Sequence, residues 1–131
     1  MEGVRRSATR LAALIADLKR TGLWEETLLV WGGEFGRTPT SEGINKPGRD
    51  HNGQGFSTWL AGGGFKPGTI YGETDEVGHR AAINKVTAND YQATLLNQFG
   101  IDHNKLIFHH GGQAKKLTND RPAHVVKEII S

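Results

Sequence analysis

Two polar clusters in the first half of the chain carry side chains that could do chemistry together. Glu34 and Arg37 follow a hydrophobic, β-prone run that ends in two glycines. Arg49, Asp50 and His51 come about a dozen residues later, on a glycine-rich segment. Open α/β sheets build their sites in this way, at the carboxyl ends of strands. Carboxylate, imidazole and guanidinium groups held close together are what metal-assisted attack on an anionic ester requires.

The carboxylates and the imidazole of these clusters are the candidate metal ligands. Asp50 and His51 are adjacent, so both can reach one cation, Asp50 through oxygen and His51 through a ring nitrogen. The alternative is that Asp50 forms a side-chain turn beside an exposed histidine. Glu34 is either a metal ligand or general base, or a carboxylate that pairs with Arg37 to order the turn. We therefore predict Glu34, Asp50 and His51 as metal ligands, with these structural alternatives open.

The two arginines are the candidate anion contacts. The planar guanidinium of Arg37 suits a sulfate or a phosphate group, and its structural alternative is the ion pair with Glu34. Arg49 lies beside the predicted metal ligands and is a second anion contact. We predict Arg37 and Arg49 as substrate-binding residues.

Other chemistry-bearing residues carry less weight. A histidine alone in a loop is more often exposed than catalytic, and this holds for His79, His103 and the pair His109-His110. The run of three glycines at 62–64 is not followed by the lysine and hydroxyl residue that make a phosphate-binding loop specific. The chain also lacks a nucleophile elbow and a dinucleotide-binding glycine motif.

Composition limits the classes of protein that fit. The chain has 131 residues, a net charge of +2 and no cysteine, which excludes disulfides and thiolate metal sites. The charge is too weak to indicate nucleic acid, and no apolar run reaches the ~18 residues of a membrane span. Glycine makes up 18 residues, nearly double the average usage of about 7%. Most of the excess lies between residues 32 and 78, which predicts loops with short strands.

The sequence pattern predicts the elements that position the clusters. An amphipathic helix is expected over 3–21, with Gly22 ending it. A strand over 27–31 is continuously apolar at 28–31, which is typical of a strand buried on both faces in a parallel sheet. Further strands are expected over 56–61 and 69–71, and a polar loop over 72–85.

Two more helices are expected in the last third of the chain. The first covers 88–99, where Thr87 and Asp90 resemble a capping box and Gly100 ends the helix. The second covers 121–130, with Asn119 or Asp120 as its cap.

Four motifs in order also carry a resemblance to a known family. They are Thr27-Leu-Leu-Val-Trp-Gly-Gly-Glu-Phe-Gly-Arg-Thr-Pro39, Gly48-Arg-Asp-His51, Trp59-Leu-Ala-Gly-Gly-Gly-Phe65 and Tyr71-Gly-Glu-Thr-Asp-Glu-Val-Gly78. Together they resemble the carboxyl-terminal part of a bacterial family known as domain of unknown function 1501. That family is similar to the sulfatases and belongs with the alkaline-phosphatase-like superfamily. The resemblance runs from about Ala8 to Ile130.

The resemblance implies a fold and an activity. The fold is α/β, the carboxyl-terminal portion of an alkaline-phosphatase-like α/β/α sandwich with a mostly parallel sheet, and residues 1–131 form a single partial domain. The activity is metal-dependent hydrolysis of a small or polymeric sulfate or phosphate ester, with zinc, calcium, magnesium or manganese as the divalent ion. The resemblance further implies that the chain is inactive alone, and that full-length members are exported.

The motifs also depart from the superfamily. There, a strand followed by Asp-His-Gly supplies ligands to one metal, and the equivalent-looking triplet here is Glu34-Phe35-Gly36. Glutamate can replace aspartate as a ligand, whereas Phe35 cannot replace histidine, and Asp50 with His51 compensates from the next loop. The nucleophile and the first metal-binding aspartate, which superfamily members carry in their amino-terminal half, are absent from this chain.

Two interpretations without catalysis stay open. The chain could be a binding module that recognises an acidic or sulfated polysaccharide through Arg37, Arg49 and Lys46, and metal dependence distinguishes it from a hydrolase. It could also be a structural module that completes the sheet of another chain. The apolar strand at 27–31 needs neighbours that two or three short strands cannot provide, so we expect an exposed apolar patch and either self-association or docking with an amino-terminal half.

Overall fold

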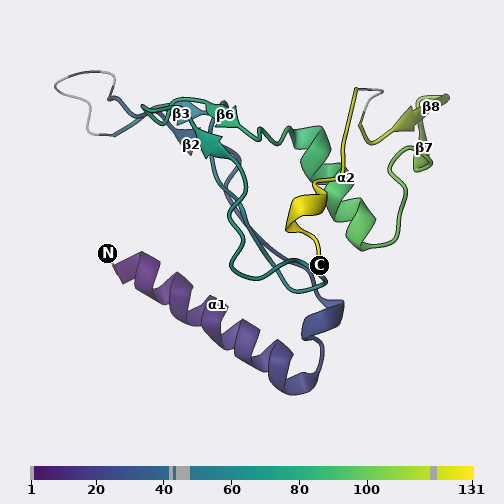
Figure 1. Ribbon diagram of the computed structural model, residues 1–131, viewed down its shortest axis with the longest axis horizontal. Helices are drawn as coiled ribbons and strands as arrows, with labels where there is room; N and C mark the ends of the chain where they lie inside the picture. The colour runs from purple at the N-terminus through teal and green to yellow at the C-terminus, as the bar shows by residue number, and fades with distance from the viewer. Residues whose placement is uncertain (1, 42, 44–47, 119–120) are drawn as a thin grey trace.

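A computed structural model describes residues 2–41, 43, 48–118 and 121–131, with side chains described from residue 7 onward (Figure 1). Along this part of the chain, one long helix precedes six short strands, and a second helix precedes a pair of strands. The elements are α1 (Glu2–Thr21), a 3-10 turn η1 (Trp24–Glu26), β1 (Leu29–Trp31), β2 (Gly36–Arg37), β3 (His51–Asn52), β4 (Trp59–Ala61), β5 (Glu73–Thr74), β6 (Ala81–Ile83), α2 (Ala88–Gln98), β7 (Ile107–His110), β8 (Gln113–Lys116) and a 3-10 turn η2 (Lys127–Ile129).

The strands of the described residues form four two-stranded sheets, β1–β4, β2–β3, β5–β6 and β7–β8, and every pair is antiparallel. The predicted α/β/α sandwich with a mostly parallel sheet is therefore wrong. The prediction rested on the family resemblance and on the apolar run at 28–31, which was interpreted as a strand buried on both faces in a parallel sheet. An apolar run fixes neither the direction of the neighbouring strand nor the cover on its faces. β1 pairs with β4, which returns antiparallel after the segment that carries β2 and β3.

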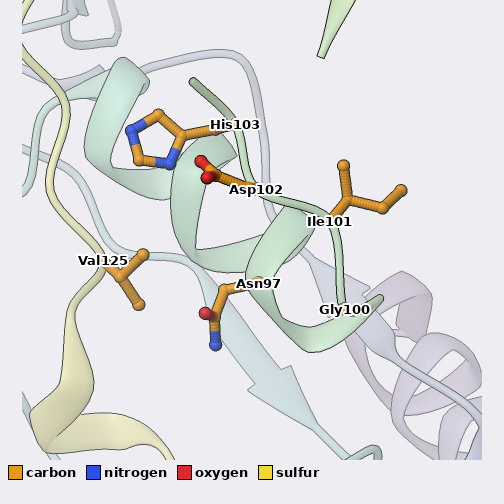
Figure 2. A pocket seen from close by; sticks show the side chains of 6 residues that line it. All are labelled: Asn97, Gly100, Ile101, Asp102, His103 and Val125. Atoms are coloured by element: carbon orange, nitrogen blue, oxygen red, sulfur yellow. The ribbon is translucent and has the colours of Figure 1, made fainter. Parts of the chain in front are cut away.

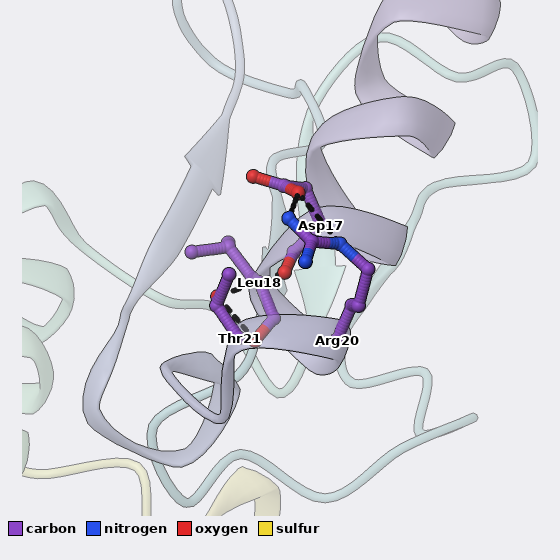
Figure 3. Close-up of polar contacts among 4 residues, drawn as sticks. All are labelled: Asp17, Leu18, Arg20 and Thr21. Carbon is purple, nitrogen blue, oxygen red and sulfur yellow. Dashed lines mark hydrogen bonds and ion pairs between the residues drawn. The ribbon is translucent and has the colours of Figure 1, made fainter.

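α1 confirms the predicted amphipathic helix and its end. Gly22 adopts a φ of 77°, its N–H donates to the carbonyl of Lys19, and the N–H of Leu23 donates to the carbonyl of Leu18. These two bonds satisfy the last carbonyls of the helix, and the left-handed residue suits glycine. Arg20 pairs with Asp17 on the solvent side at 2.6 Å (Figure 3).

The β1–β4 pair depends on a close backbone approach at Gly62. Leu29 pairs with Ala61 and Trp31 with Trp59, and the chain then turns through Gly62 at a φ of 72°. A Cβ added to Gly62 would overlap the carbonyl oxygen of Thr27. The triple glycine therefore has a packing role here, because only glycine allows both this φ and this contact.

α2 anchors the buried core. The predicted capping box is confirmed: Thr87 Oγ1 accepts from the Asp90 N–H at 3.2 Å, and Asp90 Oδ2 accepts from the Thr87 N–H at 2.9 Å. Asp90 Oδ1 accepts the N–H of His124 at 2.8 Å, and Thr94 Oγ1 accepts the N–H of Val126 at 3.0 Å. The buried side chains of α2 thus tie the carboxyl-terminal segment to the helix.

The segment 121–130 was predicted as a helix, and this is wrong apart from the single turn η2. Its backbone instead bonds to the strand-like stretch at 64–66, where Lys66 N–H donates to Ile129 carbonyl and Ser131 N–H to Gly64 carbonyl. Phe65 and Ile130 form a β-bridge. Apolar residues with β-branched side chains favour such extended pairing. The predicted caps Asn119 and Asp120 lie outside the described residues.

Two strand predictions in the glycine-rich half also need correction. Residues 69–71 form no strand, while the predicted loop at 72–85 contains β5 and β6. The strand at 56–61 is shorter than predicted, because only Trp59 to Ala61 pairs with β1. The hairpin of β7 and β8 was not predicted at all.

The chain leaves an unusually large surface open. It exposes 10046 Å², whereas a compact monomer of 14.3 kDa exposes about 6,800 Å². Large apolar side chains of the predicted apolar strand are among those exposed: Val30 at 50% and Trp31 at 52%. In the described part of the chain, no helix is both long and apolar enough to cross a membrane.

Candidate functional site

The β2–β3 ribbon brings the two predicted polar clusters together. Arg37 pairs directly with His51, and Gly36 with Asn52. The ribbon continues for one more step, where the Thr38 N–H donates to the Asp50 carbonyl at 2.9 Å and the Asp50 N–H donates to Thr38 Oγ1 at 3.0 Å. Residues twelve or more positions apart in the sequence therefore lie side by side on one short ribbon.

Asn52 fixes this ribbon to the rest of the chain. Its buried side-chain amide donates to the carbonyl of His79 at 2.7 Å and accepts the N–H of Gln54 at 3.0 Å. The next residues continue the connection, since the Ala81 N–H donates to the carbonyl of Gln54. A Cβ on Gly36 would lie 2.6 Å from the carbonyl oxygen of Gly55. The approach of the two loops therefore depends on glycine, which explains part of the glycine excess.

An aromatic stack orients the cationic side of the ribbon. The rings of Phe35 and His51 are stacked with centroids 3.9 Å apart, and the guanidinium carbon of Arg37 lies 5.8 Å from the Phe35 ring centroid. Arg37 Nη1 also donates to the carbonyl of Arg49 at 3.1 Å. Contact with a ring and a carbonyl holds the guanidinium in place, while its other N–H groups stay available to an anion.

Each predicted site residue can now be placed. Arg37, Arg49, Asp50 and His51 lie together on the ribbon and are exposed. Glu34 is exposed just before the ribbon, and in the described part of the chain it forms no ion pair with Arg37, which bonds to the Arg49 carbonyl instead. Lys46, which we named as a polysaccharide contact, lies outside the described residues.

A metal site with three preformed ligands is not found on the ribbon. Within the described residues, no group of three or more histidine, aspartate or glutamate side chains is close enough to hold a metal ion. Asp50 and His51 are two adjacent donors of the right chemical type. Glu34, Asp50 and His51 as a complete ligand set stay a prediction.

Phe35, Thr38 and Asn52 are the site residues that the sequence did not reveal. Phe35 was considered only as a residue that cannot bind metal, whereas it provides the ring against which His51 and Arg37 lie. Thr38 and Asn52 act through hydrogen bonds whose partners are set by the ribbon register. The spacing of residue types in the sequence does not identify Thr38 or Asn52 as site residues.

A separate hollow of about 310 Å³ lies at the carboxyl end of α2 (Figure 2). Its walls include Asp102, Ile101, Val125 and His103, which is only 9% exposed. The Asn104 N–H donates to Asp102 Oδ1 at 2.9 Å, and this backbone hydrogen bond holds the pKa of Asp102 below its ordinary value. The Asp102 carboxylate therefore stabilises the turn in which it lies. None of the predicted site residues lines the hollow.

Comparison with known proteins places the chain in a family. The family described as Protein of unknown function (DUF1501) matches residues 4–130. The chain belongs to this family. The match covers nearly the whole of this chain and confirms the family that its four motifs indicated, while the likeness to the sulfatases stays a prediction. None of the curated proteins and none of the solved structures matches the chain significantly.

Proposed function

We propose that this DUF1501 chain serves a sulfatase-like, metal-dependent hydrolase and that its β2–β3 ribbon binds the sulfate or phosphate group of an ester. The observation that carries the proposal is the pairing of Arg37 with His51, with the guanidinium held by the Arg49 carbonyl and the Phe35 ring. A guanidinium that is held by two such contacts presents its remaining N–H donors to an oxyanion at a smaller entropic cost than the guanidinium of a free arginine.

The metal part of the proposal concerns the carboxylates and the imidazole near the ribbon. Asp50 and His51 are the two donors that would hold a divalent ion, with Glu34 as a third ligand from the preceding turn. Such an ion, when bound, polarises the ester oxygens and stabilises the charge that develops on the leaving group. In this proposal Arg37 and Arg49 are the anion contacts, and the four candidate ions are zinc, calcium, magnesium and manganese.

Calorimetric titration with inorganic sulfate, with and without each of these ions, tests the anion contacts. Arg37→Ala should weaken sulfate binding at least about tenfold, because a charge-assisted hydrogen bond is lost. Arg20→Ala is the matched control, since Arg20 is exposed on α1 and bonded to Asp17. Equal effects of the two substitutions would contradict an anion site on the ribbon.

The double substitution Asp50→Ala with His51→Ala tests the metal ligands. It should abolish the gain in sulfate affinity that the metal provides, while the matched pair His109→Ala with His110→Ala should leave that gain intact. Both histidines of the control are exposed on β7.

A second candidate function is a metal-independent module that binds acidic polysaccharide. The exposed positions of Arg37 and Arg49 on one ribbon favour it, because two neighbouring guanidiniums can bind a polyanion without any metal. Sulfate affinity that is the same with and without metal, and that the Asp50/His51 pair does not change, would favour this function over hydrolysis.

A further inference from the structure

β1 has one edge without a strand partner in the described residues. β4 bonds to its other edge, through the pairs Leu29–Ala61, Val30–Leu60 and Trp31–Trp59. The sequence of β1 contains no charged residue and no proline. Exposed strand edges in monomers usually carry such residues, because an apolar open edge pairs with another chain.

Both faces of β1 are open as well. Val30 is 50% exposed on one face, and on the other Trp31 at 52% lies opposite Trp59 at 41%. Two tryptophans side by side are a large apolar contact area. A strand with an uncharged edge and two apolar faces is typical of the centre of a sheet, where neighbouring strands and layers cover it.

α1 adds a second open apolar surface. The helix contacts the rest of the chain mainly through η1, and it lies at the opposite end of the molecule from the β7–β8 hairpin (Figure 1). Leu14 on this helix is 46% exposed. An amphipathic helix is stabilised mainly by packing of its apolar face, so α1 also needs a partner.

The size of the open surface fits a second copy of the chain. The exposed area exceeds that of a compact monomer by about 3,200 Å². Obligate dimers bury about 1,000–2,500 Å² or more per chain. A dimer contact at the upper end of that range would remove most of the excess.

Charge also favours a second copy. The described side chains of α1, at residues 7–21, include three basic residues and one acidic residue, whereas residues 22–36 contain three glutamates and no lysine or arginine. Glu25, Glu26 and Glu34 are all exposed. In a two-fold dimer each surface meets its counterpart twice, so the basic helix of each chain can face the acidic segment of the other.

We propose that the chain forms a two-fold dimer in which the open edge of β1 pairs antiparallel with β1 of a second copy. The product is a four-stranded sheet in the order β4–β1–β1–β4, covered by the apolar faces of the two α1 helices. The isologous arrangement satisfies the open backbone groups of Leu29 to Trp31 in both copies at once.

Sedimentation velocity and light scattering over a range of concentrations test the dimer. The wild-type chain should be dimeric and should bind a hydrophobic dye weakly, and added salt should weaken the association. Val30→Lys should raise the dissociation constant at least about tenfold. Val77→Lys is the matched control, because Val77 is 66% exposed on the loop between β5 and β6, and it should leave the dimer unchanged.

A second variant keeps the test decisive if Val30→Lys fails to fold. Reversing the charge of Glu25 and Glu26 to lysine changes only exposed side chains of η1, and it should weaken the dimer while circular dichroism stays unchanged. A wild-type monomer that binds the dye at every concentration would overturn the proposal, since the cover of β1 would then be a different chain. Equal effects of the Val30 and Val77 substitutions would overturn it too.

Discussion

The α2 region and the α1–β1 region differ in the side chains that they bury and expose. Around α2 the chain buries polar groups, and each of the buried side chains of Asp90 and Thr94 has its hydrogen-bond partners within the described residues. Around α1 and β1 the chain exposes apolar groups such as Val30 and Trp31. Buried polar groups with complete partners indicate a finished core, whereas exposed apolar strands indicate an interface.

The difference shows which parts of the fold depend on local chemistry. The α2 core rests on contacts within the chain, so substitutions there should change stability at any protein concentration. The β1 region should depend on what covers it, so its contribution should vary with concentration. The effects of Gly62→Ala and Asp90→Ala on stability should therefore be compared at one fixed protein concentration, by chemical denaturation.

Gly62→Ala should give the largest loss of stability, because Gly62 lies where the end of β4 approaches the segment before β1. Gly62 has a φ of 72°, and a Cβ there overlaps the Thr27 carbonyl. We expect a loss of at least about 3 kcal/mol in the free energy of unfolding, from backbone strain and steric overlap together. Gly78→Ala is the matched control, with a φ of 71° and nothing within 4 Å of the added Cβ. It should cost only about 1 kcal/mol.

Equal losses for Gly62→Ala and Gly78→Ala would show that strain alone matters and that β1 and β4 do not need the close approach. A larger loss of stability for Gly78→Ala than for Gly62→Ala would contradict the close approach of Gly62 to the Thr27 carbonyl.

Asp90→Ala should give the next largest loss, about 2–3 kcal/mol, because it removes the carboxylate half of the capping box and leaves the N–H groups of Thr87 and His124 without acceptors. Asp17→Ala is the matched control. Its carboxylate pairs with Arg20 in an exposed position, so we expect a loss below about 0.5 kcal/mol.

The pH dependence of stability sharpens this prediction. Burial of the Asp90 carboxyl acts to raise its pKa, but the hydrogen bonds from Thr87 and His124 together outweigh burial, and the pKa lies below its ordinary value of 3.8. The stabilisation by the carboxylate is therefore complete above pH 3.8 and is lost as the pH falls through the lowered pKa of the folded state. The difference between wild type and Asp90→Ala should shrink in acid. A difference that grows as the pH falls would contradict this account of α2.

The sequence predicted the features that depend on neighbours in the chain. The helix ends at Gly22 and Gly100 and the capping box of Thr87 and Asp90 follow from local backbone chemistry, and they are confirmed. The hairpin β7–β8 was missed although its turn carried a signal. Gly111 and Gly112 adopt positive φ angles between the paired residues His110 and Gln113, and two glycines between strands are typical of a two-residue hairpin turn.

The features that failed depend on partners far along the chain. The direction of the strand beside β1 could not be predicted, because an apolar run looks the same in parallel and antiparallel sheets. The clusters at 34–37 and 49–51 were predicted to act together, and the ribbon brings Arg37 and His51 side by side. The stack of Phe35 on His51 and the bond from Asn52 to His79 follow from the register of β2 and β3, which no local pattern contains.

Nuclear magnetic resonance of the histidine rings, during titration with inorganic sulfate, tests the proposed anion site most directly. His51 lies on the ribbon opposite Arg37, whereas His109 and His110 lie exposed on β7 and serve as internal references. We predict that the His51 ring resonances shift at sulfate concentrations that leave those of His109 and His110 unchanged, and that Arg37→Ala removes this selectivity. Resonances of all three histidines that move together, or of the β7 pair first, would contradict an oxyanion site on the β2–β3 ribbon.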